Sequence, residues 1–201
     1  MDIGCIVLAG GGGLRLGQNK ALETIGERSL LEWVLYRLSF LDSDILLVTT
    51  KELAYPWLSD YPKVRVVTDL YTGKGPLGGI YTGLKLAGPF YNLVVACDMP
   101  FLNRDLLLYM IEASAGFDLV IPRVGELVEP LHGVYAKACL ASIERLLEQG
   151  VLSTREIFGL VRVKYVEAEE IDRFDPIHLS FFNINTESDL AKARALMREE
   201  T

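Results

Sequence analysis

The first half of the chain alternates between short, nearly continuous apolar runs and longer segments with apolar residues at helical spacing. Each run has the length and β-branched content of a buried strand. The runs lie at residues 3–9, 45–49, 64–68 and 92–96. The helical stripes lie at 30–38, where Ser29 is the expected N-cap, and at 78–87. This alternation predicts an α/β fold of three layers, Rossmann-like, with a mostly parallel sheet covered on both faces.

The pattern is less regular after Pro122. The expected strands lie at 119–123, 132–136, 161–166 and 181–185, and the second of them is expected to pair antiparallel at an edge of the sheet. A helix is expected at 140–147. Capping-box sequences at 153–156 and 186–189 predict a short helix and a C-terminal helix, the latter with the apolar stripe Leu190, Ala193, Leu196 and Met197.

Four consecutive glycines, Gly10 to Gly13, follow the first apolar run. Without side chains, their backbone can approach a ligand closely and point N–H groups at an anion. Arg15 and Lys20 come next, and two cations after such a loop indicate a charged ligand such as a polyphosphate. The alternative is a tight strand-to-helix turn alone, which explains one or two glycines but not this whole combination.

Two common phosphate-binding loops do not fit these glycines. A P-loop has the spacing of Gly12 and Gly17, but Gln18 stands at the position of its lysine. The dinucleotide fingerprint, started at Gly11, would place its last glycine at Leu16. The sequence therefore excludes a P-loop NTPase and argues against a dehydrogenase.

The length, the net charge and the cysteines of the chain restrict further which classes of protein it can belong to. With 201 residues, 50% of them hydrophobic, the chain 1–201 fits a single well-buried domain. A net charge of −7 argues against general binding of nucleic acid or membrane surfaces, which are polyanionic. We expect a cytoplasmic protein, since the sequence shows neither a membrane-length apolar run nor a secretory leader pattern. The scattered cysteines indicate neither disulfides nor zinc, and a monomer is compatible with the sequence.

Asp69 and Asp98 each come directly after an apolar run. Because the carboxyl ends of parallel strands meet at one edge, we expect both carboxylates and the glycines along one rim of the sheet. Asp98 offers a hard oxygen suited to Mg²⁺; the alternative is an N-cap for the next helix, for which Asn103 is better placed. Asp69 could accept hydrogen bonds from a ribose hydroxyl or a guanine N–H edge, or could start an Asx-turn, and the sequence leaves both open.

Five blocks carry a family resemblance. In chain order they are Leu8-Ala9-Gly10-Gly11; Arg15, Gly17 and Lys20; Asp69 with Gly75-Pro76-Leu77-x-Gly79-Ile80; Cys97-Asp98-x-Pro100; and Phe182-Asn183-x-Asn185-Thr186. Together they resemble the signature of molybdenum cofactor guanylyltransferases of the MobA type, over nearly the whole chain. Gly13, Leu16 and Asn19 stand where that family commonly has Ser, Met and Asp.

The resemblance implies a nucleotidyltransferase fold and the Mg²⁺-dependent transfer of GMP from GTP to a molybdopterin acceptor, with release of pyrophosphate. The catalytic residues it implies are Arg15, Lys20 and Asp98. The nucleotide would contact Leu8, Ala9, Gly10, Gly11, Lys20, Asp69 and Asp98, with Asp98 also binding Mg²⁺. The acceptor would contact Asn183 and Asn185, whose alternation along the expected strand points both amides the same way; the alternative is a polar edge strand.

This chemistry fits the residues without a catalytic base. A phosphate monoester is already ionised near neutral pH, so the obstacle is to bring two anions together and to stabilise the leaving pyrophosphate. No Ser-His-Asp or Cys-His set is then expected. The alternatives are a cytidylyl or sugar-phosphate nucleotidyltransferase, a non-catalytic nucleotide-binding module, and a flavodoxin-like or NAD-binding domain.

Overall fold

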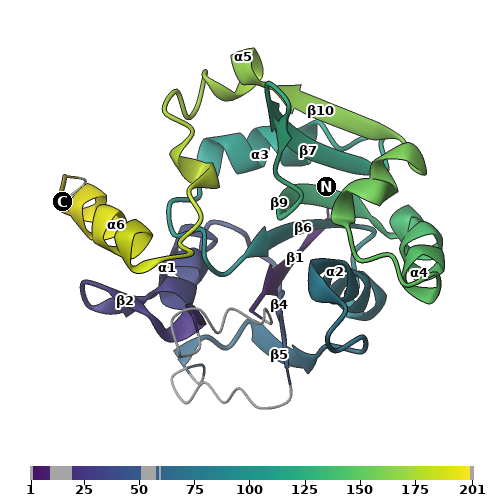
Figure 1. Ribbon diagram of the computed structural model, residues 1–201, viewed down its shortest axis with the longest axis horizontal. Helices are drawn as coiled ribbons and strands as arrows, with labels where there is room; N and C mark the ends of the chain where they lie inside the picture. Colours follow the sequence, from purple (N-terminus) through teal and green to yellow (C-terminus); the bar gives the residue numbers. More distant parts are fainter. Residues whose placement is uncertain (1, 10–19, 51–57, 59, 200–201) are drawn as a thin grey trace.

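The computed structural model describes residues 2–9, 20–50, 58 and 60–199. Its main sheet has the strand order β10-β7-β9-β6-β1-β4-β5, with β8 paired to β7 (Figure 1). All neighbours run parallel except β9, which is antiparallel to β6 and β7, and β8. The strands are β1 (Ile3–Leu8), β4 (Ile45–Thr49), β5 (Val64–Thr68), β6 (Tyr91–Ala96), β7 (Leu119–Val124), β8 (Leu127–Val128), β9 (His132–Ala136) and β10 (Val163–Glu167). The predicted α/β fold with a mostly parallel sheet is confirmed.

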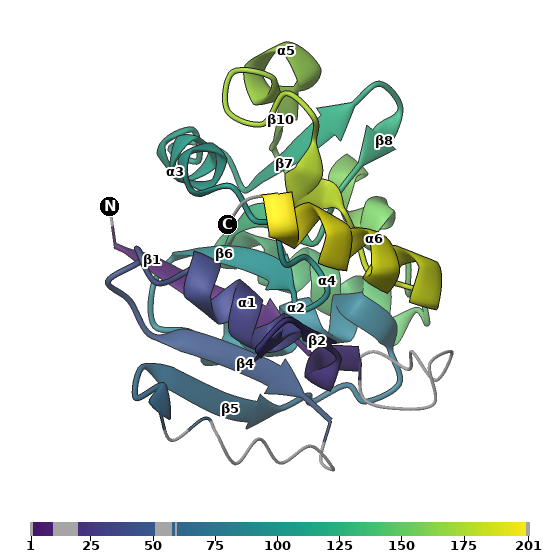
Figure 2. The same cartoon turned by 90° about the vertical axis from the view of Figure 1, so that its left-hand side faces the viewer.

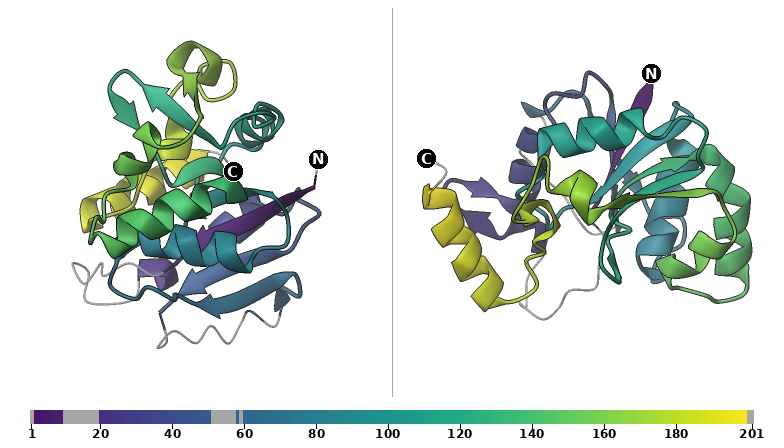
Figure 3. Two further views of the ribbon diagram at one scale, coloured as in Figure 1. Left: turned by 90° about the vertical axis from the view of Figure 1, so that its right-hand side faces the viewer. Right: turned by 90° about the horizontal axis from the view of Figure 1, so that it is seen from above.

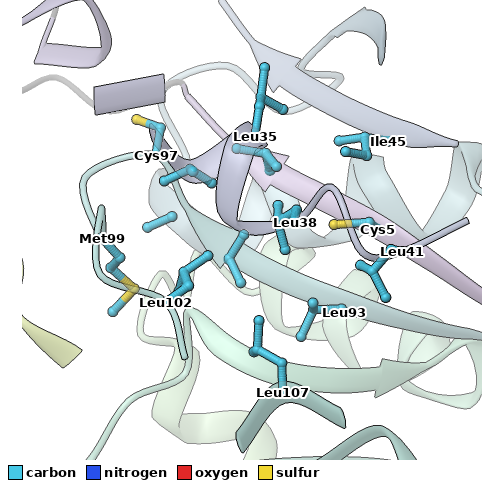
Figure 4. Packing of buried hydrophobic residues seen from close by; sticks show 14 of the residues in the cluster. Cys5, Leu35, Leu38, Leu41, Ile45, Leu93, Cys97, Met99, Leu102 and Leu107 are labelled. Carbon is cyan, nitrogen blue, oxygen red and sulfur yellow. The ribbon is translucent and has the colours of Figure 1, made fainter. Parts of the chain in front are cut away.

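Helices cover both faces of the sheet, because successive residues of a strand point to opposite sides. Cys5 and Val7 of β1 pack in one apolar cluster with residues of α1 and α3, whereas Ile6 between them packs with residues of α2 and α4 (Figure 1). Figure 4 shows the first cluster, where Leu38 and Leu93 lie close to Cys5. The helices are α1 (Leu30–Arg37), α2 (Gly75–Leu86), α3 (Arg104–Glu112), α4 (Leu140–Glu148), α5 (Ala168–Ile171) and α6 (Glu187–Glu199).

Helix α2 packs unusually closely on β1 because glycines face the strand. A Cβ atom built on Gly83 would lie 2.5 Å from Cγ2 of Ile6, and one built on Gly79 would lie 3.2 Å from Cδ2 of Leu8. The helix begins at Gly75, with Pro76 in its first turn, so it starts three residues before the predicted stripe at 78–87. The glycines therefore bring the N-terminal part of α2 close to the end of β1.

Helix α6 lies to one side of the three layers (Figure 3, right). It packs with the hairpin of β2 (Thr24–Ile25) and β3 (Arg28–Ser29) in a small apolar cluster that includes Leu190, Ala193 and Met197, as the predicted stripe requires. Its predicted cap is also present, since Thr186 Oγ1 accepts a hydrogen bond from the backbone N–H of Asp189 at 3.1 Å. The same holds for α1, where Ser29 and Glu32 form a capping box.

Three sequence predictions were wrong. Strand β9 lies inside the sheet between β6 and β7, not at an edge, and it is buried along its whole length because strands cover both of its sides. The short helix η5 (Thr154–Gly159) forms, but its N-cap Ser153 makes no side-chain capping hydrogen bond. Residues 181–185 are not a strand: the helix η6 (Leu179–Phe181) ends there and irregular chain follows. The remaining short helices are η2 (Lys20–Leu22) and η4 (Lys137–Cys139).

All three cysteines are buried and none forms a disulfide, as expected. In the part of the chain that the structure describes, the helices are too short or too polar to cross a lipid bilayer.

Candidate active site

The carboxyl ends of β1, β4, β5 and β6 form one edge of the sheet, which we call the rim. The backbone ladder continues just past these ends: Ala9 N–H donates to the carbonyl of Val48 at 2.9 Å, and Asp69 N–H donates to that of Thr49 at 2.9 Å. Asp69 and Asp98 therefore lie at the same edge, as predicted, with β1 and β4 between their strands. Three strand spacings correspond to roughly 14 Å.

The glycine loop, which follows β1 in the sequence, lies outside the described residues. Gly10, Gly11 and Arg15 lie outside the described residues, and of Lys20 only the backbone is described, at the start of η2. Leu8 and the buried Ala9 are described, and they place the entry to the loop at the end of the central strand β1. The sequence predictions for the loop therefore stay predictions.

Asp98 is half-buried directly after β6. Its alternative role as a helix cap is excluded, because Asn103 Oδ1 caps α3 by accepting from the N–H groups of Asp105 and Leu106, each at 3.0 Å. The backbone carbonyl of Asp98 accepts a hydrogen bond from the N–H of Ile184 at 3.1 Å. The Asp98 carboxylate thus stands at the rim, where the C-terminal part of the chain comes back to meet β6.

Asp69 has a structural role that is well defined. Its Oδ1 accepts hydrogen bonds from the N–H of Tyr71 at 3.0 Å, which is an Asx-turn, and from the hydroxyl of Thr82 at 2.7 Å. Thr82 Oγ1 in turn accepts from the N–H of Leu70 at 3.0 Å. The Asx-turn alternative is therefore realised, and it ties the end of β5 to α2. Both bonds use Oδ1, and Oδ2 takes part in no hydrogen bond among the described residues.

The strand expected at 181–185, on which the shared orientation of the two asparagines was predicted, is absent. Asn183 is half-buried, and its Nδ2 donates to Oε2 of Glu129 at 3.3 Å and to the carbonyl of Phe181 at 3.2 Å. Asn185 is exposed, and its backbone N–H donates to Asp189 Oδ2 at 3.1 Å. Asn183 therefore belongs to the rim beside Asp98, whereas Asn185 lies next to the cap of α6.

Glu129 is a site residue that the sequence analysis missed. It lies in the connection between β8 and β9, and burial raises the pKa of its carboxyl, as does the negative charge of Asp98. The N–H of Leu131, the amide of Asn183 and the charge of Arg155 act in the opposite direction. In the sequence, Pro130 and Leu131 separate Glu129 from the buried strand β9, so the pattern that singled out Asp98 after an apolar run does not extend to Glu129.

The fold is that of nucleotidyltransferases, since solved structures of this class share the whole architecture. A 2-C-methyl-D-erythritol 4-phosphate cytidylyltransferase from Thermus thermophilus, 20% identical, superposes with a TM-score of 0.74 over 98% of this chain and all of that chain, which shows the fold alone. The chain belongs to the family of the MobA-like NTP transferase domain, whose model matches residues 5–164.

Full-length relatives define its place in the family. A probable molybdenum cofactor guanylyltransferase of Pelotomaculum thermopropionicum is 39% identical over 95% of this chain and 91% of that protein. The molybdenum cofactor guanylyltransferase of Desulfosudis oleivorans is 34% identical over 96% of this chain and 95% of that protein. The crystal structure of molybdopterin-guanine dinucleotide biosynthesis protein A from Archaeoglobus fulgidus is 31% identical. It has a TM-score of 0.84, and the match covers 98% of this chain and 99% of that chain.

Proposed function

We infer that the protein is a molybdenum cofactor guanylyltransferase, which transfers GMP from GTP to a molybdopterin acceptor and releases pyrophosphate. The observation that carries this inference is the similarity over almost the full length of both chains, at 39% and 34% identity, to proteins of that name. The placement of Asp98, Asp69 and Asn183 along one rim supports it. Three buried cysteines without disulfides fit a reducing compartment such as the cytoplasm.

The residues at the rim fit a Mg²⁺ ion. Mg²⁺ in nucleotide enzymes is commonly held by one or two carboxylates together with substrate phosphates and waters. Asp98 supplies a half-buried carboxylate at the edge where the nucleotide phosphates would lie. When bound there, the ion would neutralise charge on the phosphates during transfer.

The remaining roles belong to the chain itself. Arg15, Lys20 and the N–H groups at Leu8 to Gly11 would stabilise the triphosphate and the leaving pyrophosphate. Asp69 would accept a hydrogen bond from the guanine or ribose through Oδ2. The acceptor phosphate is already ionised, so these groups need only bring the reactants together and disperse charge, and a general base is not required.

Nucleotide choice and turnover test the proposal together. Thermal stabilisation by GTP, CTP, ATP and UTP is compared with Mg²⁺ present, and pyrophosphate release is then measured with molybdopterin as acceptor. We expect the largest stabilisation with GTP and release of pyrophosphate only when acceptor is supplied. A preference for CTP would contradict guanylyl transfer, and binding of GTP without turnover would favour a non-catalytic module.

A further inference from the structure

A pocket of about 370 Å³ lies on the acceptor side of the rim. Apolar side chains of the β7–β8 hairpin, Val124 and Val128 among them, form one wall, and Phe181 of η6 lines it as well. Figure 2 shows this hairpin beside the segment that leads into α6. The charged groups that line the pocket are Glu129 and Arg155, with His178 beside them.

Glu129 is fixed in the pocket wall but keeps capacity to accept hydrogen bonds. Its Oε1 accepts from the N–H of Leu131 at 3.4 Å, and its Oε2 accepts from Asn183 at 3.3 Å. Both distances are long for N–H···O bonds, whose usual value is about 2.9–3.0 Å. A carboxylate has about four lone-pair positions, and burying it with weak partners is unfavourable. A ligand with strong donors would therefore gain from binding here.

One short piece of chain links the wall of this pocket to Asp98. Asn183 contacts Glu129, and the next residue, Ile184, donates its N–H to the carbonyl of Asp98 at 3.1 Å. Asp98 follows β6, which has β1 on one side and β9, preceded by Glu129, on the other. The two carboxylates are close enough for the charge of Asp98 to act on Glu129, so one extended molecule could contact both.

We propose that this pocket binds the pterin ring of the acceptor and that Glu129 determines specificity by accepting hydrogen bonds from the ring's amino and N–H groups. The inference rests on the proposed function. A pterin presents two neighbouring donors on its pyrimidine edge, which match the two oxygens of one carboxylate. The apolar hairpin and Phe181 suit the faces of a flat ring, and Arg155 provides a compensating positive charge. Guanine carries a similar donor edge, but the pocket lies on the β9 side of β6, whereas β1, which precedes the glycines in the sequence, lies on the other side.

Fluorescence titration with two small pteridines tests this directly. Pterin carries the amino group, whereas lumazine has an oxygen in its place that would face the carboxylate. We expect the wild-type protein to bind pterin at least about tenfold more tightly than lumazine, because one hydrogen bond to a charged group contributes that much to the affinity. Glu129→Gln should reduce the ratio to about threefold or less. Glu126→Gln, an exposed position in the same hairpin, is the matched control and should leave the ratio unchanged.

Steady-state kinetics separates the two ligands. Glu129→Gln should raise KM for molybdopterin about tenfold and leave KM for GTP unchanged. Retained discrimination in the variant, equal or undetectable binding of both pteridines to the wild-type protein, or a change confined to KM for GTP would overturn the proposal. Because the wild-type titration needs no variant, a folding defect in Glu129→Gln leaves the test intact. Absence of GTP turnover by the wild-type protein would instead contradict the proposed function.

Discussion

The two halves of the rim are built by different means. On the side that we propose binds the nucleotide, here the nucleotide side, β1, β4 and β5 are parallel neighbours, and α2 packs on β1 through glycines. On the side that we propose binds the acceptor, here the acceptor side, the antiparallel β9, the β7–β8 hairpin and the irregular chain around Asn183 come together. Asp98 lies where the halves meet. Regular strand-to-helix units suffice to present backbone groups to phosphates, whereas a shaped pocket for a particular acceptor needs segments from distant parts of the chain.

Hydrogen bonds between distant residues hold the acceptor side together. Asn103 donates its backbone N–H to Ser180 Oγ at 3.0 Å and its amide to the carbonyl of Phe174 at 2.9 Å. The buried Asp175 accepts from the N–H groups of Leu179 and Ser180 at 2.9 and 2.7 Å. These bonds fix η6, and with it Asn183, against the start of α3. The position of the acceptor residues is therefore set by tertiary contacts.

The largest effect is expected at Asp98, the point that both halves share. Asp98→Asn keeps the shape of the side chain but removes the charge available to Mg²⁺. We expect kcat to fall by about 10²- to 10³-fold, the range found when one preorganised transition-state interaction is removed. Pyrophosphate release at saturating GTP and acceptor measures this, and an unchanged melting temperature shows that the fold is intact. If the variant turned over as fast as the wild-type protein, Asp98 would have no role in the reaction.

The acceptor side should also be the part most sensitive to acid. His132 at the start of β9 is fully buried, and within the described residues neither of its ring nitrogens has a hydrogen-bond partner. Burial lowers its pKa to about 4 from 6.5, although the charge of Asp175 acts in the opposite direction. Between these two values the unfolded state binds more protons than the folded state, so stability falls as the pH falls from 6.5 towards 4.

The size of this loss follows from the shift. A difference of this size in pKa corresponds to about 3 kcal/mol in the free energy of unfolding across the whole window. Urea unfolding at a series of pH values between 7 and 4 measures it, and His132→Phe, which cannot titrate, is the control. A parallel pH dependence in the two proteins would show that other groups dominate the acid response.

On the nucleotide side, the glycines of α2 offer a test of close packing. Gly83→Ala places a methyl group against three carbons of Ile6, at 2.5 to 3.0 Å, in the centre of the sheet. Better helix propensity favours alanine by up to about 1 kcal/mol, but overpacking costs about 1–3 kcal/mol. We expect net destabilisation of about 1–2 kcal/mol by urea unfolding. Gly88→Ala is the control and should not change the stability, because a Cβ atom at Gly88 meets nothing within 4 Å. An unchanged stability of Gly83→Ala would show that β1 shifts to make room for the methyl group.

Asp69 allows structure and ligand binding to be separated at one residue. Asp69→Asn keeps an oxygen for the Asx-turn and for Thr82, whereas Asp69→Ala removes both hydrogen bonds. We expect the alanine variant to lose about 1–2 kcal/mol of stability and the asparagine variant to lose little. Both should bind GTP several-fold more weakly, by isothermal titration. An unchanged affinity of Asp69→Asn for GTP would show that Asp69 has only the structural role of the Asx-turn.

The same difference between the two halves of the rim explains which of their features could be predicted from the sequence. The strands β4 and β5 lie at the predicted residues 45–49 and 64–68, although only β4 is buried along its whole length and β5, at the edge of the sheet, is partly exposed. Residues 181–185 were expected to form a strand, yet contacts of Ser180 with Asn103 and of Asn183 with Glu129 hold this segment in a different conformation. For that reason a pattern-based analysis found Asp98 but not Glu129. The local pattern identifies the edge of a sheet, but not which side chains a distant loop brings to it.

The smallest effect distinguishes the two asparagines that the sequence treats as equivalent. Asn183→Ala removes the amide that contacts Glu129, and we expect KM for the acceptor to rise about tenfold, since one hydrogen bond to a charged group is lost. Asn185→Ala should change it less than about threefold, because this residue is exposed and its backbone N–H, which alanine keeps, donates to Asp189. KM for GTP is the internal control for both variants. A larger effect at Asn185 than at Asn183 would mean that the acceptor approaches along the cap of α6 instead of through the pocket at Glu129.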